Sequence, residues 1–461
     1  MGPQLADPAA VVAALAEPPE ASGPPTGAPE ASPAAWYGLG VLILVALFAT
    51  VDGQIFGLVA EPLRKALGMS DTQLGLLQGV GGVLVLSLAA FPIGWLADRF
   101  DRRMVLAAGV LLWGLACLAR GFAHSFDQLL AATIALSVGS AGLVPCIYGI
   151  IPTLFLGRKR LLANAIFVVV LYMGAAAGLA LCGALLFGLE AARAQLPDWL
   201  RALDTWRIAF FVLGAPAPLV AIALLTIRLR RRDQAEAAPA HAAVAPSTGL
   251  IDYIRNNRAS VAAICVGSGM IAFGATVRGW APIIAARVFA AAPGEIGAKL
   301  GLGNAIGLCC GIAFTTFITR RYAARLGARF PLRVLWIGGL ASASVSLVAL
   351  TAKTSLEFFV LMGLQTAVET AGTMVSPGLL QDLAPTHLRS RMIAICVVVA
   401  TAISAGGPPL VGAISDALKP DSHGLLLAAV AVGVVGTVSA CLIFLLAERP
   451  YKRTVDALAS A

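Results

Sequence analysis

Three ionisable residues stand inside long apolar runs of this 461-residue chain: Asp52, Arg278 and Glu369. A charged side chain at membrane depth is costly, so it is a functional candidate by default. Desolvation also favours the neutral form of a carboxyl group. Such a group can therefore bind and release a proton as its surroundings alternate between wet and dry. We predict that these three residues couple protons or bind substrate.

Each of the three also has a structural alternative. Asp52 could be a hydrogen-bonded carboxylate near one membrane face. Arg278 and Glu369 could pair with each other, because a lone buried charge of either sign is prohibitive. The guanidinium of Arg278 could instead bind a carboxylate or phosphate, or extend to the membrane surface.

Polar, uncharged residues in the same runs are weaker cavity candidates. Each could instead make a hydrogen bond between neighbouring helices. They are Gln54, Tyr148, Asn164, Tyr172, Asn304, Gln365, Thr373 and Ser376.

A dense charged turn joins two apolar runs and consists of Asp98, Arg99, Asp101, Arg102 and Arg103. Between two membrane-length runs, these residues predict a tight turn at a bilayer surface, and the preceding Gly94 would let two helices approach closely. Asp98 could dock on the N-terminus of the segment beginning near Arg391, where exposed backbone donors favour a carboxylate. Alternatively, the turn only sets topology.

The composition identifies a helical membrane protein. Hydrophobic residues make up 59% of the chain and charged residues 12%, whereas soluble domains are about a quarter charged. The net charge of +9 comes from connections between apolar runs, so we expect no nucleic-acid partner. The cysteines and histidines lack metal-ligand spacing, and neither a nucleotide-binding loop nor a G-x-S-x-G motif occurs. We therefore expect no metal, no cofactor and no enzyme activity.

The apolar runs form twelve segments, each long enough to cross about 30 Å of hydrocarbon. Residues 1–35, rich in Ala and Pro, predict a disordered cytoplasmic tail, and 449–461 predict a second tail. The segments are 36–60, 72–97, 104–122, 128–154, 162–189, 206–228, 259–288, 299–319, 332–351, 356–381, 391–415 and 423–447.

Basic residues set the orientation. Lys and Arg gather in alternate connections, which predicts that both termini are cytoplasmic. The longest cytoplasmic connection, 229–257, is a linker that divides the segments into six-helix bundles at 36–228 and 258–448. Such halves, with a site between them near mid-membrane, are typical of a rocking transporter. In the outer connection 190–205 we expect a short interfacial helix.

The charged turn resembles the G-x-x-x-D-R/K-x-G-R-R/K loop of the major facilitator superfamily. Two further stretches are similar to its Spinster-like branch. The first includes Asp52-Gly53-Gln54-Ile55, Glu61-Pro62 and Leu67-Gly68-Met69-Ser70-Asp71-Thr72-Gln73. The second includes Gln381-Asp382-Leu383-Ala384-Pro385, Arg389-Ser390-Arg391, Gly407-Pro408-Pro409 and Ser415-Asp416.

This resemblance implies that Gly94, Asp98, Arg99, Arg102 and Arg103 form a latch that holds the outward-facing state. The chain departs from the family at several charges. Asp101 replaces the usual glycine of the loop, while Gly53, Thr133 and Ser140 occupy positions where the branch carries charged residues. The second-half copy of the loop lacks its aspartate.

The resemblance implies an all-α major facilitator fold and a proton-linked secondary transporter that works by alternating access. We expect a monomer in a bacterial inner membrane that moves an amphiphilic, lipid-like substrate of the lysophospholipid or sphingosine-phosphate type. A proton-coupled carrier of small organic anions or drugs is one alternative. A non-transporting membrane sensor on a carrier scaffold is another.

Overall fold

The computed structural model describes residues 32–227, 248–385, 388–419 and 423–459, and these described residues form helices and no strand. Within these described ranges, twelve helical spans are long and apolar enough to cross a membrane, which confirms the expected segments and the all-α class. Large apolar side chains such as Phe91 and Leu446 are 85% and 77% exposed. Exposed apolar residues on membrane-length helices suit a lipid environment, so this is a multi-pass membrane protein.

The N-terminal half contains six of the spans. Two of them break just before Pro145 and Pro216, which lack a backbone donor and cannot complete the helical hydrogen-bond pattern. The elements are α2 (Pro33–Leu67), α3 (Asp71–Leu76) continued by the π-helical η1 (Leu77–Leu84) and α4 (Val85–Arg99), α5 (Arg102–Phe122), α6 (Phe126–Ala141) with α7 (Leu143–Leu154), α8 (Gly157–Ala191), and α10 (Thr205–Gly214) with α11 (Ala217–Leu225).

The C-terminal half has the same design. Its seventh and eleventh spans, counted along the chain, are also interrupted near their middles, at Ala275 and at Ala405-Gly406. The elements are α14 (Arg258–Gly274) with α15 (Thr276–Val288), α16 (Pro293–Glu295) with the π-helical η3 (Ile296–Leu300) and α17 (Gly301–Leu326), α18 (Phe330–Ala349), α19 (Ser355–Asp382), α20 (Arg389–Ser404) with α21 (Gly407–Ala417), and α22 (Gly424–Ala459).

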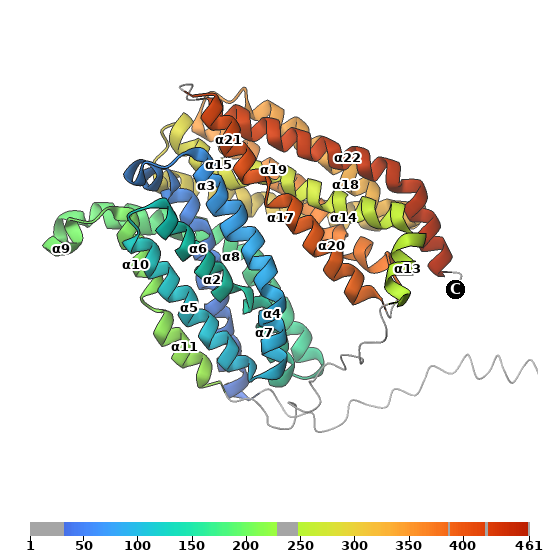
Figure 1. Cartoon of the computed structure of the whole chain (residues 1–461), viewed down its shortest axis with the longest axis horizontal. Helices are drawn as coiled ribbons and strands as arrows, with labels where there is room; N and C mark the ends of the chain where they lie inside the picture. Colours follow the sequence, from blue (N-terminus) through green and yellow to red (C-terminus); the bar gives the residue numbers. More distant parts are fainter. Residues whose placement is uncertain (1–31, 228–247, 386–387, 420–422, 460–461) are drawn as a thin grey trace, which may run out of the picture.

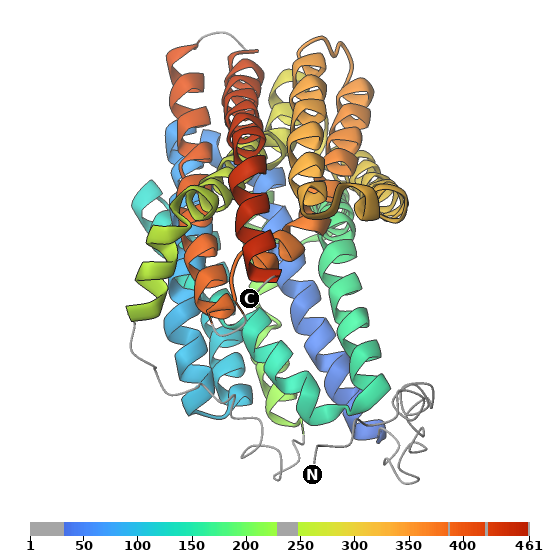
Figure 2. The ribbon, with the colours of Figure 1, turned by 90° about the vertical axis from the view of Figure 1, so that its right-hand side faces the viewer.

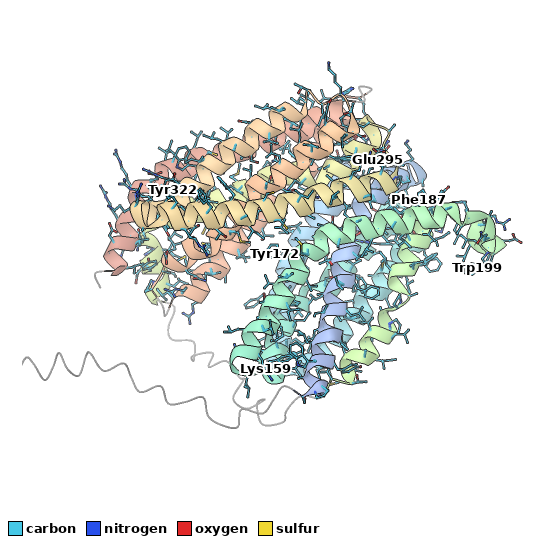
Figure 3. The ribbon with its side chains drawn as sticks, turned by 180° about the vertical axis from the view of Figure 1, so that it is seen from behind. Lys159, Tyr172, Phe187, Trp199, Glu295 and Tyr322 are labelled. Carbon is cyan, nitrogen blue, oxygen red and sulfur yellow. The ribbon has the colours of Figure 1, made fainter. Side chains whose placement is uncertain are left out.

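The two halves meet at one end and separate towards the other (Figure 1). Helix α3 packs against α21, α2 against α15, and α8 against η3 and α17. Seen from behind, Phe187 of α8 and Glu295 of α16 lie close together, whereas Lys159 and Tyr322 lie on parts of α8 and α17 that diverge (Figure 3). A view turned by 90° shows the red α22 beside the orange helices of its own half (Figure 2). We call the end at α3 and α21 the closed end and the end at residues 98–103 the open end.

Glycines make the closed end tight. A Cβ atom added to Gly75 would lie 2.3 Å from the backbone oxygen of Pro408, and one added to Gly412 would lie 2.2 Å from the backbone oxygen of Asp71. Neither distance is compatible with a real side chain. The helices of the two halves therefore touch backbone to backbone at this end.

The expected tails and linker fall partly outside the described residues, which omit 1–31, 228–247 and 460–461. Within the linker 229–257, residues Thr248–Asn256 form the helix α13, and its Tyr253 hydroxyl donates to the Leu383 carbonyl at 2.7 Å. This part is therefore helical and docked on the C-terminal half. Helix α22 continues through much of the expected tail 449–461. The division at this linker otherwise stays a prediction.

The connection at 190–205 contains the short helix α9 (Asp198–Arg201). Its Trp199 is 69% exposed and lies at the tip of the connection (Figure 3). An exposed tryptophan on a short helix between two spans suits an interfacial anchor.

Candidate transport cavity

A cavity of about 970 Å³ lies between the two halves. Its walls differ in chemistry. The C-terminal half lines it with polar groups that include Arg278, Asn304, Thr366, Glu369 and Thr373. The N-terminal half contributes a mostly apolar surface that includes Phe56, Val83 and Leu86, into which the buried charged group around Asp52 and polar side chains such as Gln54, Gln78 and Tyr172 are set. The cavity can therefore hold an amphipathic molecule.

Asp52 lies on α2 and is 4% exposed. The indole Nε1 of Trp113 donates to its Oδ2 at 3.4 Å, and the thiol of Cys117 lies 3.6 Å from its Oδ1. A guanidinium nitrogen of Arg120 lies 3.9 Å from Oδ1. These contacts hold Asp52 in the cavity wall, next to a cation.

Arg120 is a residue whose role the sequence does not reveal, because it stands near the end of the predicted span 104–122, where a basic residue ordinarily sets topology. The structure shows that its side chain is buried and that its guanidinium lies over the rings of Phe56 and Phe210, each 5.8 Å from the ring centroid. Its position inside the predicted span 104–122 was the available signal. Arg120 supplies the cation that is missing at Gly53.

The positions that depart from the family's charges line the same cavity. An added Cβ at Gly53 would meet nothing within 4 Å, so this residue leaves space. The hydroxyl groups of Thr133 and Ser140 donate to carbonyls of their own helix, those of Leu129 and Leu136. All three positions are therefore electrically neutral walls of the cavity.

Arg278 and Glu369 come together across the cavity wall. The Nε of Arg278 on α15 lies 2.5 Å from Oε2 of Glu369 on α19, and the Arg278 side chain is 43% exposed. The other carboxylate oxygen, Oε1, accepts from the Gln365 amide at 2.8 Å and from the Ser342 hydroxyl at 3.5 Å. Arg278 thus faces the cavity, while Glu369 is held from behind.

The weaker candidates divide into two groups. Gln54, Tyr172, Asn304 and Thr373 line the cavity. Outside that lining, Tyr148 stacks edge-on against Phe167, Gln365 orients Glu369, the Ser376 hydroxyl donates to its own helix, and Asn164 has an unpaired side-chain oxygen.

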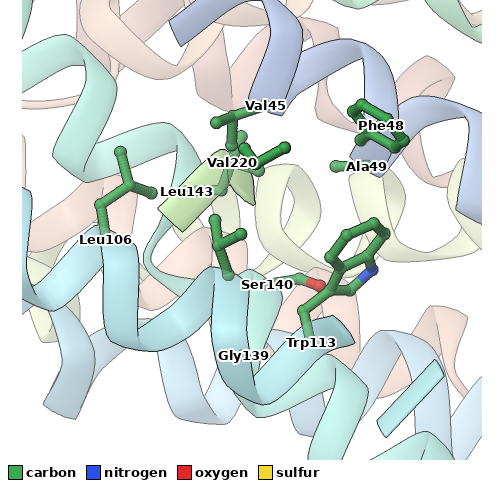
Figure 4. Close-up of a pocket in the computed structure, with 10 residues that line it drawn as sticks. Val45, Phe48, Ala49, Leu106, Trp113, Gly139, Ser140, Leu143 and Val220 are labelled. Atoms are coloured by element: carbon green, nitrogen blue, oxygen red, sulfur yellow. The ribbon is translucent and has the colours of Figure 1, made fainter. Parts of the chain in front are cut away.

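A second pocket, of about 10 Å³, lies within the N-terminal half (Figure 4). Val45, Phe48, Ala49 and Leu106 surround it together with the Trp113 ring. It has room for about one water molecule. The larger cavity is therefore the candidate substrate site.

The charged turn makes its contacts inside the N-terminal half. Asp98 pairs with Arg102 at 3.1 Å, and Arg102 also donates to the Gly149 carbonyl. Arg99 lies over the Trp95 ring. An added Cβ at Gly94 would meet nothing within 4 Å, so the expected close helix approach at Gly94 is absent in this conformation.

Asp101 has a local role that explains its presence in this turn. Its carboxylate accepts from the backbone nitrogen of Arg103 and caps α5. Hydrogen bonds from the Arg103 guanidinium hold the pKa of Asp101 below its usual range, against the effect of partial burial. Arg103 also donates to the Ile227 carbonyl at 2.6 Å, which fastens the turn to the end of α11.

The closed end contains a charged cluster that the sequence reasoning did not assign. Arg287 of the C-terminal half donates to Glu61 at 2.7 Å and to Asp71 at 2.7 Å, both in the N-terminal half. Arg64 pairs with Glu61 at 2.9 Å, and Lys419 lies 3.8 Å from Asp71. Opposite charges therefore join the two halves here.

A second contact crosses the same boundary. The carboxylate of Asp416, near the end of α21, accepts from the backbone nitrogens of Asp71 and Thr72 at 3.0 and 2.8 Å. It also accepts from the Thr72 hydroxyl at 2.7 Å. Asp416 therefore caps the N-terminus of the helical span Asp71–Arg99, as a carboxylate at a helix N-terminus can. These residues stood in the family-like motifs, but nothing local predicted their contacts.

Two bundles that surround a central cavity define a membrane transporter, and comparison with known proteins identifies its family. The Major Facilitator Superfamily model matches residues 42–324, so the chain belongs to this superfamily of transporters and is not an enzyme. It is 27% identical over 435 residues to an MFS-type efflux pump of Mycolicibacterium smegmatis. The aligned region covers 91% of this chain and 94% of that protein.

Other relatives support the same class. A 3-(3-hydroxyphenyl)propionate transporter of Escherichia coli is 29% identical over 215 residues, 46% of this chain and 49% of that protein. The fold also matches the crystal structure of a bacterial homolog to the human lysosomal transporter Spinster, in an inward-facing and unoccupied conformation. The TM-score is 0.72 and the sequence identity 21%, and the match covers 93% of this chain and 98% of that one. The expected Spinster-like fold is thus confirmed.

Proposed function

We propose that this protein is a proton-linked secondary transporter that moves an amphiphilic substrate by alternating access. The observation that carries the proposal is the cavity between two halves that pack tightly at the closed end and diverge towards the open end. A substrate there faces one side of the membrane, and rocking of the halves would expose it to the other side. The protein would act as a monomer in a bacterial inner membrane.

The distribution of basic residues supports an orientation for this conformation. The open end carries Arg99, Arg102 and Arg103, and cytoplasmic connections are enriched in such residues. The open end is therefore cytoplasmic, as are both termini, and the conformation is inward-facing. In this state Asp98 pairs with Arg102. The proposed latch to α20 would form only when the cytoplasmic end closes.

Proton coupling is assigned to the two acidic residues of the cavity, Asp52 and Glu369. Each is paired with an arginine in the cavity wall, Arg120 and Arg278 respectively. Protonation of either carboxyl would release its arginine and change the charge of the cavity. That change gives the empty and loaded carrier different electrostatic energies in a low-dielectric space.

Two substrate types fit the amphipathic walls. A lysophospholipid or sphingosine-phosphate type would place its chain on the apolar wall and its head group at Arg278. A small organic anion or drug is the second candidate. It is favoured by the exposed guanidinium of Arg278 and by the similarity to an efflux pump and to a 3-(3-hydroxyphenyl)propionate transporter. Both use the same cationic anchor.

Counterflow in proteoliposomes tests the transport function. We expect preloaded lysophosphatidylcholine or 3-phenylpropionate to drive uptake of its labelled form. We expect Asp52→Asn to reduce uptake driven by a pH gradient at least tenfold. Asp198→Asn is the matched control, because its side chain on α9 is 97% exposed and far from the cavity. Absence of flux for both probes would favour a sensor over a carrier.

A further inference from the structure

The ion pair between Arg278 and Glu369 uses only part of the arginine. The Nε atom of Arg278 contacts Oε2 of Glu369, and among the described residues Glu369 is the one ion-pair partner of Arg278. Since the Arg278 side chain is 43% exposed and lines the cavity, part of the guanidinium fork faces the space where a substrate would lie. A carboxylate or phosphate matches that fork in two parallel hydrogen bonds.

The charges of the cavity balance. Among the described lining residues, the charged groups are Asp52, Arg120, Arg278 and Glu369, and Tyr172 is the remaining titratable one. Two cations thus face two anions. An additional anion would carry an uncompensated charge into a low-dielectric space, which costs several kcal/mol per ion. Binding of an anion is therefore favourable only if one carboxylate becomes neutral.

Glu369 is better placed than Asp52 to be that carboxylate, because the side chain of its partner Arg278 is 43% exposed and can reach a ligand, whereas that of Arg120 is 6% exposed. Its Oε1 stays hydrogen-bonded to Gln365 and Ser342 from the side away from Arg278. Gln365 is itself 1% exposed and accepts from the Ser346 hydroxyl, so this support is fixed. Glu369 can therefore lose Arg278 and still be held in position, with a proton on Oε2.

We propose that the substrate is an amphipathic organic monoanion whose anionic group replaces Glu369 on Arg278 while Glu369 takes up one proton. Before binding, Arg278 balances Glu369; afterwards it balances the ligand, and Glu369 is neutral. One proton enters the site with each anion, so the cavity keeps its charge. This inference rests on the proposed transport function and adds the substrate class and the proton stoichiometry.

The apolar wall fixes the orientation of the ligand. Arg278 belongs to the C-terminal half, whereas Phe56, Val83 and Leu86 line the opposite wall. An anion seated on Arg278 would therefore place its apolar body against the N-terminal half. Contact with both halves is what a ligand needs if it is to favour their closure around it.

Proton uptake on binding tests the exchange. Purified protein in lipid nanodiscs, in weakly buffered solution with a pH indicator, is titrated with 3-phenylpropionate, with the monoanionic phosphodiester lysophosphatidylglycerol, and with the neutral 3-phenylpropionamide. We expect about one proton taken up per anion bound, and a Kd that rises about tenfold per pH unit where Glu369 is ionised, since binding is linked to one proton. The two anions show whether a short carboxylate or a lipid phosphate is preferred.

Three variants sharpen the test. Glu369→Gln should bind the anion without proton uptake and with a Kd independent of pH, and Arg278→Gln should weaken binding at least tenfold at every pH. Arg333→Gln is the matched control, because Arg333 pairs with Glu448 in the same half at 3.3 Å outside the cavity. It should keep the proton uptake of the native protein.

Several results would overturn the exchange. They are anion binding by the native protein without proton uptake, equal binding of the neutral amide, or no binding of either anion. If Glu369→Gln fails to fold, the proton count of the native protein still decides. Counterflow of a neutral amphiphile without this linkage would leave the transport function standing and refute the inference. Proton-linked binding without flux would leave the inference standing and refute the transport function.

Discussion

Replacing Arg287 by alanine should open the closed end. The guanidinium of Arg287 makes hydrogen bonds of 2.7 to 3.1 Å to Glu61 and Asp71. The Asp71 side chain is fully buried and that of Arg287 is 15% exposed. Arg287→Ala would therefore leave the fully buried Asp71 without its main partner and would leave Glu61 paired mainly with Arg64.

The magnitude follows from the burial of the pair. Removing one partner of a buried ion pair costs about 3–5 kcal/mol. Arg64 and Lys419, at 3.7 and 3.8 Å from Asp71, remain as cations and place the effect near 3 kcal/mol. The open form at this end exposes the same carboxylates to water and is not penalised. Since about 1.4 kcal/mol is a factor of ten, the ratio of the two forms should shift about a hundredfold.

Distance measurements between the halves report this shift. Spin labels at Lys65→Cys and Lys299→Cys lie on exposed side chains of the two halves at the closed end. The exposed Cys309 and Cys310 are first replaced by serine. Double electron–electron resonance should show one short distance in the parent protein and a dominant longer distance in Arg287→Ala.

Two control variants test whether the charged cluster around Arg287 holds this end closed. Arg287→Lys keeps a cation but loses the fork, so it should show an intermediate distribution. Arg193→Ala removes an arginine whose partner, Glu190, lies in the same half, so it should leave the distances unchanged. If Arg287→Ala retains the short distance, the cluster does not hold this end closed.

Three further changes test other parts of the structure. Asp98→Asn should lower transport several-fold with unchanged expression, because the proposed contact of Asp98 with the N-terminus of α20, a charged helix cap of about 1 kcal/mol, is lost. Wild-type uptake rates in this variant would contradict the latch. Gly412→Val should keep the closed end apart, since its Cβ would overlap the backbone opposite, and the same spin-label distances report it. Arg120→Gln should lower the unfolding free energy by about 3 kcal/mol by stranding Asp52; thermal unfolding should show the loss largely restored when Asp52→Asn is added.

The spans were predictable because membrane-length apolar runs leave few other folds open. Their ends were less so. Helix α2 continues to Leu67, well beyond the predicted limit at residue 60, and ends at Gly68, which adopts the left-handed conformation of a helix C-cap. Glu61 and Arg64 pair one turn apart within the helix. Charges that a hydropathy pattern assigns to a loop can thus remain helical.

The cavity was partly predictable for a similar reason. The cost of a lone buried charge made a partner for Arg278 necessary, and Glu369 was the acidic residue placed deepest inside an apolar segment of the same half. The role of Arg120 was missed because a count of basic residues treats every cation near a span end as equal. The contact of Asp416 with Thr72 joins residues 344 positions apart, and no local pattern specifies it.

The cap on the span Asp71–Arg99 has a consequence for the resting balance of the carrier. This span offers backbone donors at one end, where Asp416 binds, and carries a carboxylate, Asp98, at the other. The neighbouring span Arg391–Ala417 runs in the opposite direction and has the same two features in reverse. If Asp98 docks on that span when the cytoplasmic end closes, the two forms are held by the same kind of bond. The two caps then offset each other in free energy, so the pairs that Arg287 makes with Glu61 and Asp71 at the closed end set which form the unloaded protein favours.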